Sequence, residues 1–195
     1  IRGNRTELST GRQQIQYQYD ALSRLRQVVA TLDNGRSQTT SYSYDGVGNR
    51  AGMVHPNGTV VEYQYDVRNR LKSLVHKASS AAGAAILLSL SYSVDASGLR
   101  TQIAETRPGT STAITRVTDY QYDAVKRLTR ETVSGSNAQT RTSTWTYDKV
   151  GNRKTESSGG TINRSQTYTY DANDRLLSET GTQPYTYSYD AAGNL

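Results

Sequence analysis

Tyr42-Ser43-Tyr44-Asp45-Gly46-Val47-Gly48-Asn49-Arg50 is the fullest copy of a motif that recurs along this chain of 195 residues. Its aspartates follow one another at intervals of 25, 21, 29, 28, 25, 23 and 19 residues, the differences between the numbers of Asp20, Asp45, Asp66, Asp95, Asp123, Asp148, Asp171 and Asp190. Gly3-Asn4-Arg5 matches the tail of a ninth copy. Self-similarity at such a spacing is typical of repeat architectures, so the sequence predicts one structural unit used many times.

Every tyrosine of the chain belongs to this motif. The 15 tyrosines lie one, three or five residues before a motif aspartate, and the single tryptophan, Trp145, takes the third place before Asp148. A spacing of two places side chains on one face of an extended strand. Ile15 and Val61 continue this face upstream, while glutamine, serine and threonine fill the opposite one. The motif therefore predicts eight half-buried β-strands.

The aspartate and the glycine of the motif predict a turn after each strand. Asp is favoured first in a type I turn, where its carboxylate accepts backbone N–H groups, and Gly fourth, where φ is often positive. Four copies fit this pattern, and the four between them read Asp-x-x-x-Arg-Leu instead. Their fourth residues are Ser23, Asn69, Lys126 and Asp174, of which only Asn and Asp tolerate a left-handed backbone well. Since the two forms alternate strictly, we interpret them as neighbouring turns in different environments.

The aromatic, aspartate and glycine residues of the motif form the predicted structural site of the chain. They are Tyr17, Tyr19, Asp20, Tyr42, Tyr44, Asp45, Gly48, Tyr63, Tyr65, Asp66, Tyr92, Asp95, Gly98, Tyr120, Tyr122, Asp123, Trp145, Tyr147, Asp148, Gly151, Tyr168, Tyr170, Asp171, Tyr187, Tyr189, Asp190 and Gly193.

Over its whole length the chain resembles the RHS or YD-repeat family, whose consensus approximates Gly-x-x-x-x-Tyr-x-Tyr-Asp-x-x-Gly-Arg-Leu. The resemblance implies β-hairpins joined side by side into a long sheet that spirals into a hollow shell. Members include bacterial polymorphic toxins, the B and C components of Tc insecticidal toxins, wall-associated proteins and animal teneurins. Members that carry toxins end their repeats with a self-cleaving aspartyl region, whose Asp-Pro-x-Gly motif does not occur in this sequence.

The composition predicts a thin, single-sheet structure with one solvent-exposed face. Only 34% of the residues are hydrophobic, phenylalanine is absent, and the mean hydropathy is -0.74. Tyrosine suits such a sheet because it buries its ring and still satisfies its hydroxyl. The regular tyrosines argue against disorder, the other explanation of so polar a chain. Zero cysteines exclude disulfides, and the longest apolar run, 84–90, is too short to span a bilayer.

The net charge of +6 raises the question of nucleic-acid binding. The motif arginines are distributed one per hairpin instead of forming a basic cluster. This distribution favours pairing with the motif aspartates and argues against a nucleic-acid partner.

An all-β meander of sixteen antiparallel strands accounts for the pattern, with fixed aspartate turns on one edge and variable turns on the other. Residues 1–195 are predicted to form one repeat region, an excerpt of a longer array, with edge strands at 5–8 and 184–189. The loop 77–84 has room for a short helical turn, and Leu87 should be covered locally. So wide a sheet should curl into a spiral, its concave face lined by stacked tyrosine ladders.

Recognised catalytic and cofactor motifs do not occur in the sequence, which holds no Gly-x-Ser-x-Gly, phosphate-binding glycine loop or His-Glu-x-x-His. The spacing of His55 and His76 does not suggest a shared ligand set. Each turn offers one carboxylate beside an arginine, whereas calcium takes about six to eight oxygen ligands. The sequence therefore predicts turn-capping aspartates, and no catalytic residue, metal site or cofactor.

We expect a non-catalytic structural segment of an RHS-type β-shell that encloses or displays another polypeptide, such as a toxin domain. Its partners would be the rest of the parent shell or other copies of itself, and its place would be secreted or at the surface of a bacterial cell. The alternative is an adhesion module that binds carbohydrate or a partner protein through exposed tyrosines such as Tyr63 and Tyr65. Packed tyrosines would favour the shell, and solvent-accessible, unpartnered ones the adhesion module.

Overall fold

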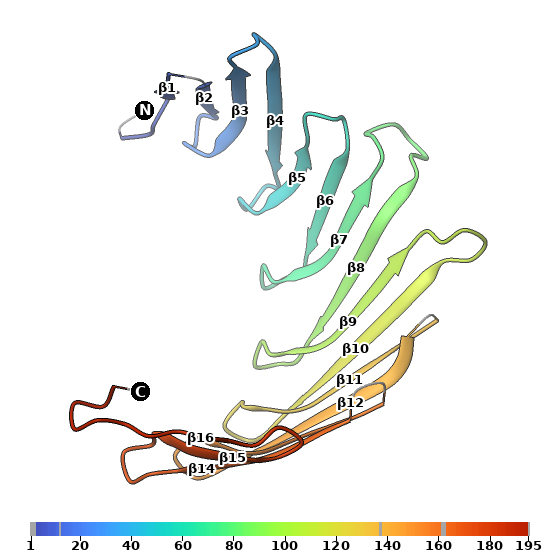
Figure 1. Ribbon diagram of the computed structural model, residues 1–195. Helices are drawn as coiled ribbons and strands as arrows, with labels where there is room; N and C mark the ends of the chain where they lie inside the picture. Colours follow the sequence, from blue (N-terminus) through green and yellow to red (C-terminus); the bar gives the residue numbers. More distant parts are fainter. Residues whose placement is uncertain (1–2, 12, 137, 161–162, 195) are drawn as a thin grey trace. The chain divides into compact units, whose positions relative to one another are not determined.

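A computed structural model describes residues 3–11, 13–136, 138–160 and 163–194, which form strands and turns with no helix among them (Figure 1). Consequently these residues contain no helix that could cross a membrane. The strands are hydrogen-bonded neighbours in chain order, from β1 to β16. The prediction of an all-β antiparallel meander is thus confirmed. The chain forms two compact units: unit 1 is Ile1–Ser91 with Thr106–Ala113, and unit 2 is Tyr92–Glu105 with Ile114–Leu195.

Unit 1 is a twisted, bent sheet whose strands fan out in Figure 1. Two valines on opposite faces of one strand, Val60 and Val61, are its buried hydrophobic residues among those described. Its strands are β1 (Glu7–Thr10), β2 (Gln13–Tyr19), β3 (Leu25–Leu32), β4 (Ser37–Tyr44), β5 (Arg50–Val54), β6 (Val60–Tyr65), β7 (Leu71–Lys77) and the beginning of β8 (Ile86–Val94).

Unit 2 is also a bent antiparallel sheet (Figure 1), but most of its buried side chains are polar. Among the described residues of unit 2, Thr118, Ser143 and Gln166 are buried polar residues, and Val133 is the one buried hydrophobic residue. Its strands, after the end of β8, are β9 (Arg100–Arg107, to Glu105), β10 (Ile114–Tyr122), β11 (Leu128–Gly135), β12 (Ala138–Tyr147), β13 (Arg153–Gly159), β14 (Arg164–Tyr170), β15 (Leu176–Gly181) and β16 (Tyr185–Thr186).

The strands alternate between a half-buried and an exposed face, as a period of two requires. In β6 Tyr63 and Tyr65 are half-buried, whereas Glu62 and Gln64 are exposed. We call the first side the tyrosine face. Its rings do not stack on one another: in the part of the chain that the structure describes, the only ring–ring contact joins two histidines.

The predicted tyrosine ladders are therefore wrong, and strand spacing gives the reason. The motif tyrosines lie on every second strand, so those of successive repeats are separated by about 9.6 Å. Aromatic pairs need ring centroids within about 4.5–7 Å of each other. The residues of the intervening strand fill the space between the rings.

A β-bulge follows each aspartate turn for which the register is known, a feature that the sequence did not predict. Tyr19 pairs with Leu25 but Gln18 pairs with Gln27, so Arg26 is an extra residue. The same shift recurs in the other such hairpins. As a result, the aromatic residue three places before each of these aspartates faces the residue eight places after it.

Two expectations about the loop before β8 are also wrong. Residues 77–84 form no helix; Ala84 N–H donates to Ala81 O at 3.1 Å in a turn that Gly83 closes with a φ of 77°. Leu87 is not covered and remains 38% exposed. The reason is a register shift after His76, which pairs with Leu88 while Lys77 pairs with Ile86 and leaves Leu87 unmatched.

The edge strands differ from their predicted bounds. The first strand is Glu7–Thr10 in place of 5–8, and its residues are all exposed. The last is only Tyr185–Thr186 in place of 184–189. Tyr187 N–H still donates to Leu177 O at 2.9 Å, but the ladder ends there.

Candidate functional site: the aspartate turns and the tyrosine face

All eight motif aspartates close the same five-residue turn. In each, the aspartate N–H donates to the carbonyl four residues later, at 2.9 Å in Asp20 and 3.0 Å in Asp190. The residue at the fourth place has a positive φ in every copy, including Ser23 at 62° and Lys126 at 69°. The turn geometry therefore imposes a left-handed backbone even on Ser23 and Lys126, whose side chains do not favour that conformation.

The carboxylate of each aspartate satisfies the backbone of its own turn. Asp20 Oδ1 accepts the N–H groups of Leu22 and Arg24, both at 2.9 Å, and Oδ2 accepts Arg24 Nε at 2.7 Å. The hydrogen bond from the Arg24 backbone is the main reason that the pKa of Asp20 is lowered, against the opposing effect of desolvation. In Asp45 desolvation is the largest influence, yet bonds from Asn49 and its neighbours outweigh it and the pKa is lowered again. These carboxylates are turn caps, already occupied by donors.

The Arg-form turns, which read Asp-x-x-x-Arg-Leu, contact the next repeat through their arginine. Arg24 lies 4.5 Å from the centroid of the Tyr44 ring, and Arg127 lies 4.7 Å from that of Tyr147. Arg127 Nη1 also donates to Asp148 O, in the following turn, at 2.8 Å. The guanidinium thus bridges its own aspartate and the next tyrosine, combining an ion pair with a cation–π contact.

Two of the Gly-form turns contact the next repeat through an asparagine. Asn49 Nδ2 donates to Asn69 Oδ1 at 3.0 Å, and Asn152 Nδ2 donates to Asp174 Oδ1 at 2.7 Å. The acceptors are the fourth residues of the following Arg-form turns, where glycine would offer no side-chain oxygen. At these positions the two forms of turn thus make two different turn-to-turn contacts.

At most of the motif aspartates, the tyrosine directly before the aspartate anchors its strand to the preceding turn. Tyr44 Oη donates to Leu25 O at 2.7 Å, and Tyr147 Oη donates to Leu128 O at 2.8 Å. The same bond, to the carbonyl five places after the preceding aspartate, is made by Tyr122, Tyr170 and Tyr189. Phenylalanine could not make it, which gives a physical reason for the absence of phenylalanine from the chain.

The residues that face the motif aromatics across each hairpin differ between the two units. In unit 1 the residues eight places after the aspartate are apolar: Val28, Met53 and Leu74. In unit 2 three of the corresponding residues are glutamates: Glu131, Glu156 and Glu179. The sequence analysis missed these glutamates, although their recurrence eight places after an aspartate is visible in the sequence once the bulge is known.

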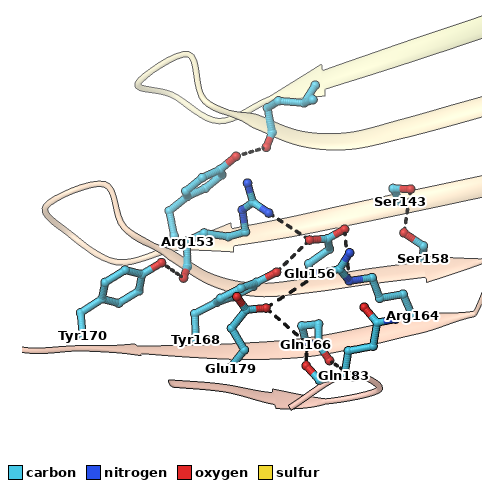
Figure 2. A network of polar contacts seen from close by, with 12 residues as sticks. Ser143, Arg153, Glu156, Ser158, Arg164, Gln166, Tyr168, Tyr170, Glu179 and Gln183 are labelled. Carbon is cyan, nitrogen blue, oxygen red and sulfur yellow. Dashed lines mark hydrogen bonds and ion pairs between the residues drawn. The ribbon is translucent and has the colours of Figure 1, made fainter. Parts of the chain in front are cut away.

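Two of the glutamates belong to one polar network on β13 to β15 (Figure 2). Glu156 Oε2 accepts Arg153 Nη1 and Tyr168 Oη, both at 2.9 Å. Arg164 lies between the carboxylates, 3.9 Å from Glu156 Oε1 and 3.9 Å from Glu179 Oε2. Burial first, and then the bond to Glu156, raises the pKa of Tyr168. The charges are paired with one another, so neither carboxylate is a free acid or base.

Gln166 completes this network at its most buried point, with 1% of its surface exposed. Its Nε2 donates to Glu179 Oε2 at 3.4 Å and to the carbonyl of Gln183, and its Oε1 accepts Gln183 N–H at 3.0 Å. Gly181 pairs with Gln166 across the sheet; a Cβ there would collide with Ser165 O and come within 2.7 Å of Gln166 Oε1. Glycine therefore makes room for the buried amide.

The described residues contain no group of three or more His, Asp or Glu side chains that could hold a metal ion. His55 and His76, however, lie in ring contact, with centroids 5.8 Å apart. Their sequence spacing suggested no association, so this proximity corrects the expectation of two isolated histidines.

A family model described as RHS Repeat matches residues 19–60 and 170–195, which contain the turns of Asp20, Asp45, Asp171 and Asp190. The expected resemblance to the RHS-repeat family is thus confirmed over these two segments. No curated protein sequence matches it.

Solved structures of Tc toxin components share the fold of this chain. TcdB2-TccC3 without its hypervariable C-terminal region aligns over 85% of the chain and 9% of its own length, at 19% identity and a TM-score of 0.73. The Photorhabdus luminescens Tc holotoxin pore aligns over 92% of the chain and 11% of its own length, at 15% identity and a TM-score of 0.68. The chain thus spans about a tenth of the solved chains that it matches.

Proposed function

We propose that this RHS segment is a non-catalytic part of a β-shell that encloses or displays another polypeptide in a longer protein. The observation that carries the proposal is the contact from each turn to the next. Arginine and asparagine side chains bridge successive turns, and tyrosine hydroxyls tie strands to the preceding turn. Because each repeat is held by contacts with its neighbours, such a sheet can be lengthened by adding repeats and does not require a separate hydrophobic core. These are the properties expected of a shell wall.

The lining of unit 2 adds support. Its glutamates, arginines and tyrosines hydrogen-bond to one another, so they have few free donors and acceptors to offer an enclosed chain. A polar surface whose hydrogen-bonding groups are already paired offers an unfolded polypeptide neither free polar partners nor much apolar area. It should therefore bind such a polypeptide weakly. Retention of a cargo without tight binding is what an enclosing wall requires.

Protease protection in the full-length parent protein tests the proposal. We expect the enclosed polypeptide to resist digestion in the wild type and to be digested faster when Arg127→Ala and Tyr147→Phe together weaken one turn-to-turn contact. Gln64→Ala, at an exposed position of β6, should leave protection unchanged. Equal digestion of the cargo in the presence and absence of the intact repeat segment would reject the enclosing role.

The proposed shell role also suggests the binding partners and the cellular location of the protein. As partners we propose the rest of the parent shell and an enclosed polypeptide, and as its place the exterior or surface of a bacterial cell. The solved relatives are described as components of a Tc holotoxin, which supports this placement by analogy only.

An adhesion module remains the second candidate because of one open groove in unit 1. The groove has a volume of about 640 Å³ and is lined by Tyr63, Tyr65, Asn49, Asn69 and Lys72, among others. Ring faces beside planar amides could hold a sugar. Glycan binding by the wild type that disappears in Tyr63→Ala and persists in Gln121→Ala would support this candidate, and the absence of binding to any glycan would remove it.

Self-association through the edge strands is a further proposal. Strands β1 and β16 each present one edge without a neighbouring strand in the described chain, and such edges can pair with another copy. Light scattering over a concentration series should show growth of the wild type and less growth of Thr186→Lys. A wild type that remains monomeric at high concentration would exclude this association.

A further inference from the structure

The only two histidines of the chain, 21 positions apart in the sequence (76 minus 55), are brought together by the fold. Their ring centroids are 5.8 Å apart and the ring planes are inclined by 51°. Both lie in unit 1, and the turn, ion-pair and tyrosine contacts described above do not involve them. Their association therefore requires its own explanation.

The backbone holds both histidines in fixed positions. His55 N–H donates to Thr59 O at 2.8 Å, and His55 O accepts Gly58 N–H at 2.9 Å, so the turn that His55 opens is closed at both ends. His76 lies within β7, paired with Val61 of β6 on one side and with Leu88 of β8 on the other. Both rings thus approach each other from ordered backbone, and little conformational entropy remains to be lost on binding a shared ligand.

One ring nitrogen of the pair lacks a partner. His76 Nε2 is buried and makes no hydrogen bond, beside Val61, which is 6% exposed. An unpaired polar atom in such surroundings is costly and calls for a functional explanation. The nearest charged pair, Lys77 and Glu62 at 2.7 Å, does not supply a partner, because both are one residue out of register and therefore belong to the opposite face.

We propose that His55 and His76 bind a divalent transition-metal ion of the zinc and copper class. Zn–N distances of about 2.0–2.1 Å place the metal about 3.2 Å from each ring centroid. Two such rings at a tetrahedral angle have centroids about 5.2 Å apart, and at a linear angle about 6.4 Å apart. The observed 5.8 Å lies between these limits. Water or a group from another molecule would complete the coordination.

Imidazole selects the class of metal. Nitrogen ligands suit zinc, copper and nickel, whereas magnesium and calcium take oxygen ligands. Within the first class, affinity should follow the order Cu²⁺ above Ni²⁺ and Zn²⁺. Only neutral imidazole binds a metal, so acid should weaken the binding.

Titration calorimetry and thermal unfolding of the chain with Zn²⁺, Cu²⁺ and Mg²⁺ test this site. We expect Zn²⁺ and Cu²⁺ to bind and to raise the melting temperature, since a ligand of the native state stabilises it, and Mg²⁺ to do neither. Removal of even an outer partner of a metal ligand weakens binding about 10–100-fold, so loss of a ligand in His55→Gln should weaken it by more than about tenfold. Glu62→Gln, on the opposite face, is the matched control and should bind as the wild type does.

A spectroscopic measurement separates this site from adventitious binding. Cu²⁺ bound to the wild type should show hyperfine coupling to two imidazole nitrogens, and in His55→Gln to one at most. His55 lies in a turn, so this variant should fold even if His76→Gln, within the sheet, does not. Equal Zn²⁺ affinity in the wild type and His55→Gln, or no Zn²⁺ binding near neutral pH, would overturn the proposal.

Discussion

Unit 1 and unit 2 have the same aspartate turns, the same bulges and the same tyrosine anchors, but their tyrosine faces differ in polarity. Opposite the motif aromatics, unit 1 has residues such as Met53 and Leu74, and unit 2 has Glu131, Glu156 and Glu179. Unit 1 buries Val60 and Val61, whereas unit 2 buries mainly polar side chains. One backbone framework therefore accepts either lining, because its contacts lie in the turns and not in a shared core.

Acid should produce the largest effect, and in both units alike, because the aspartate turns are common to them. The pKa of every motif aspartate is lowered from its ordinary value of 3.8 in the folded chain. A lowered folded pKa gives stability that is present above the unfolded pKa and is lost as the pH falls through the folded pKa.

Urea unfolding from about pH 6 down to about pH 2 measures this loss. We expect the urea midpoint of the wild type to hold steady and then to fall steeply below about pH 3.8. The urea midpoint of Asp45→Asn should fall less over the same range. A midpoint that declines equally in Asp45→Asn would mean that other groups cause the acid sensitivity.

Loss of a half-buried motif tyrosine should come next, again equally in the two units. Tyr65→Ala in unit 1 and Tyr122→Ala in unit 2 should each lower the free energy of unfolding by about 3 kcal/mol, the lower end of the range for a large aromatic because both rings are half-buried. Their exposed neighbours, in Gln64→Ala and Gln121→Ala, should change it by less than about 0.5 kcal/mol. Denaturant midpoints that do not separate the tyrosine from the glutamine variants would show that the tyrosine face is not the stabilising one.

Exchange of the lining residues should distinguish the units. Glu156→Leu in unit 2 should cost about 1–3 kcal/mol, because Arg153 and Tyr168 lose their acceptor in a part-buried site. Leu74→Met in unit 1 keeps the apolar character and should cost less than about 1.5 kcal/mol. If Glu156→Leu were as stable as the wild type, the polar network would be dispensable for folding, and its charges would have to serve another purpose.

The smallest expected effect is a gain at the strained turns. Ser23 in unit 1 and Lys126 in unit 2 have left-handed backbones, so Ser23→Gly and Lys126→Gly should each stabilise by about 0.5–1 kcal/mol. Asn69→Gly is the control and should bring no gain, since it removes the acceptor of Asn49. Thermal unfolding checks the three variants, and a gain in Asn69→Gly alone would contradict the argument.

The sequence alone determined the strands and the aspartate turns, because both depend on contacts within a few residues. The spacing of Tyr63 and Tyr65 places them on one face of any extended strand, and Asp45 caps its turn with backbone groups only two and four residues away. The same motif recurs in each repeat, so the number and order of the strands can be predicted from the sequence.

Only the tertiary structure decided which residues meet across the strands. The bulge after each turn shifts the register by one residue, and a shift of one exchanges the faces of a strand, so the pairing of Trp145 with Glu156 could not be assigned without it. The contact of His55 with His76 likewise depends on how β5, β6 and β7 align. Local chemistry thus fixes the turns and strands. Whether two distant residues meet depends on the register of every hairpin between them, and that register follows from the tertiary structure.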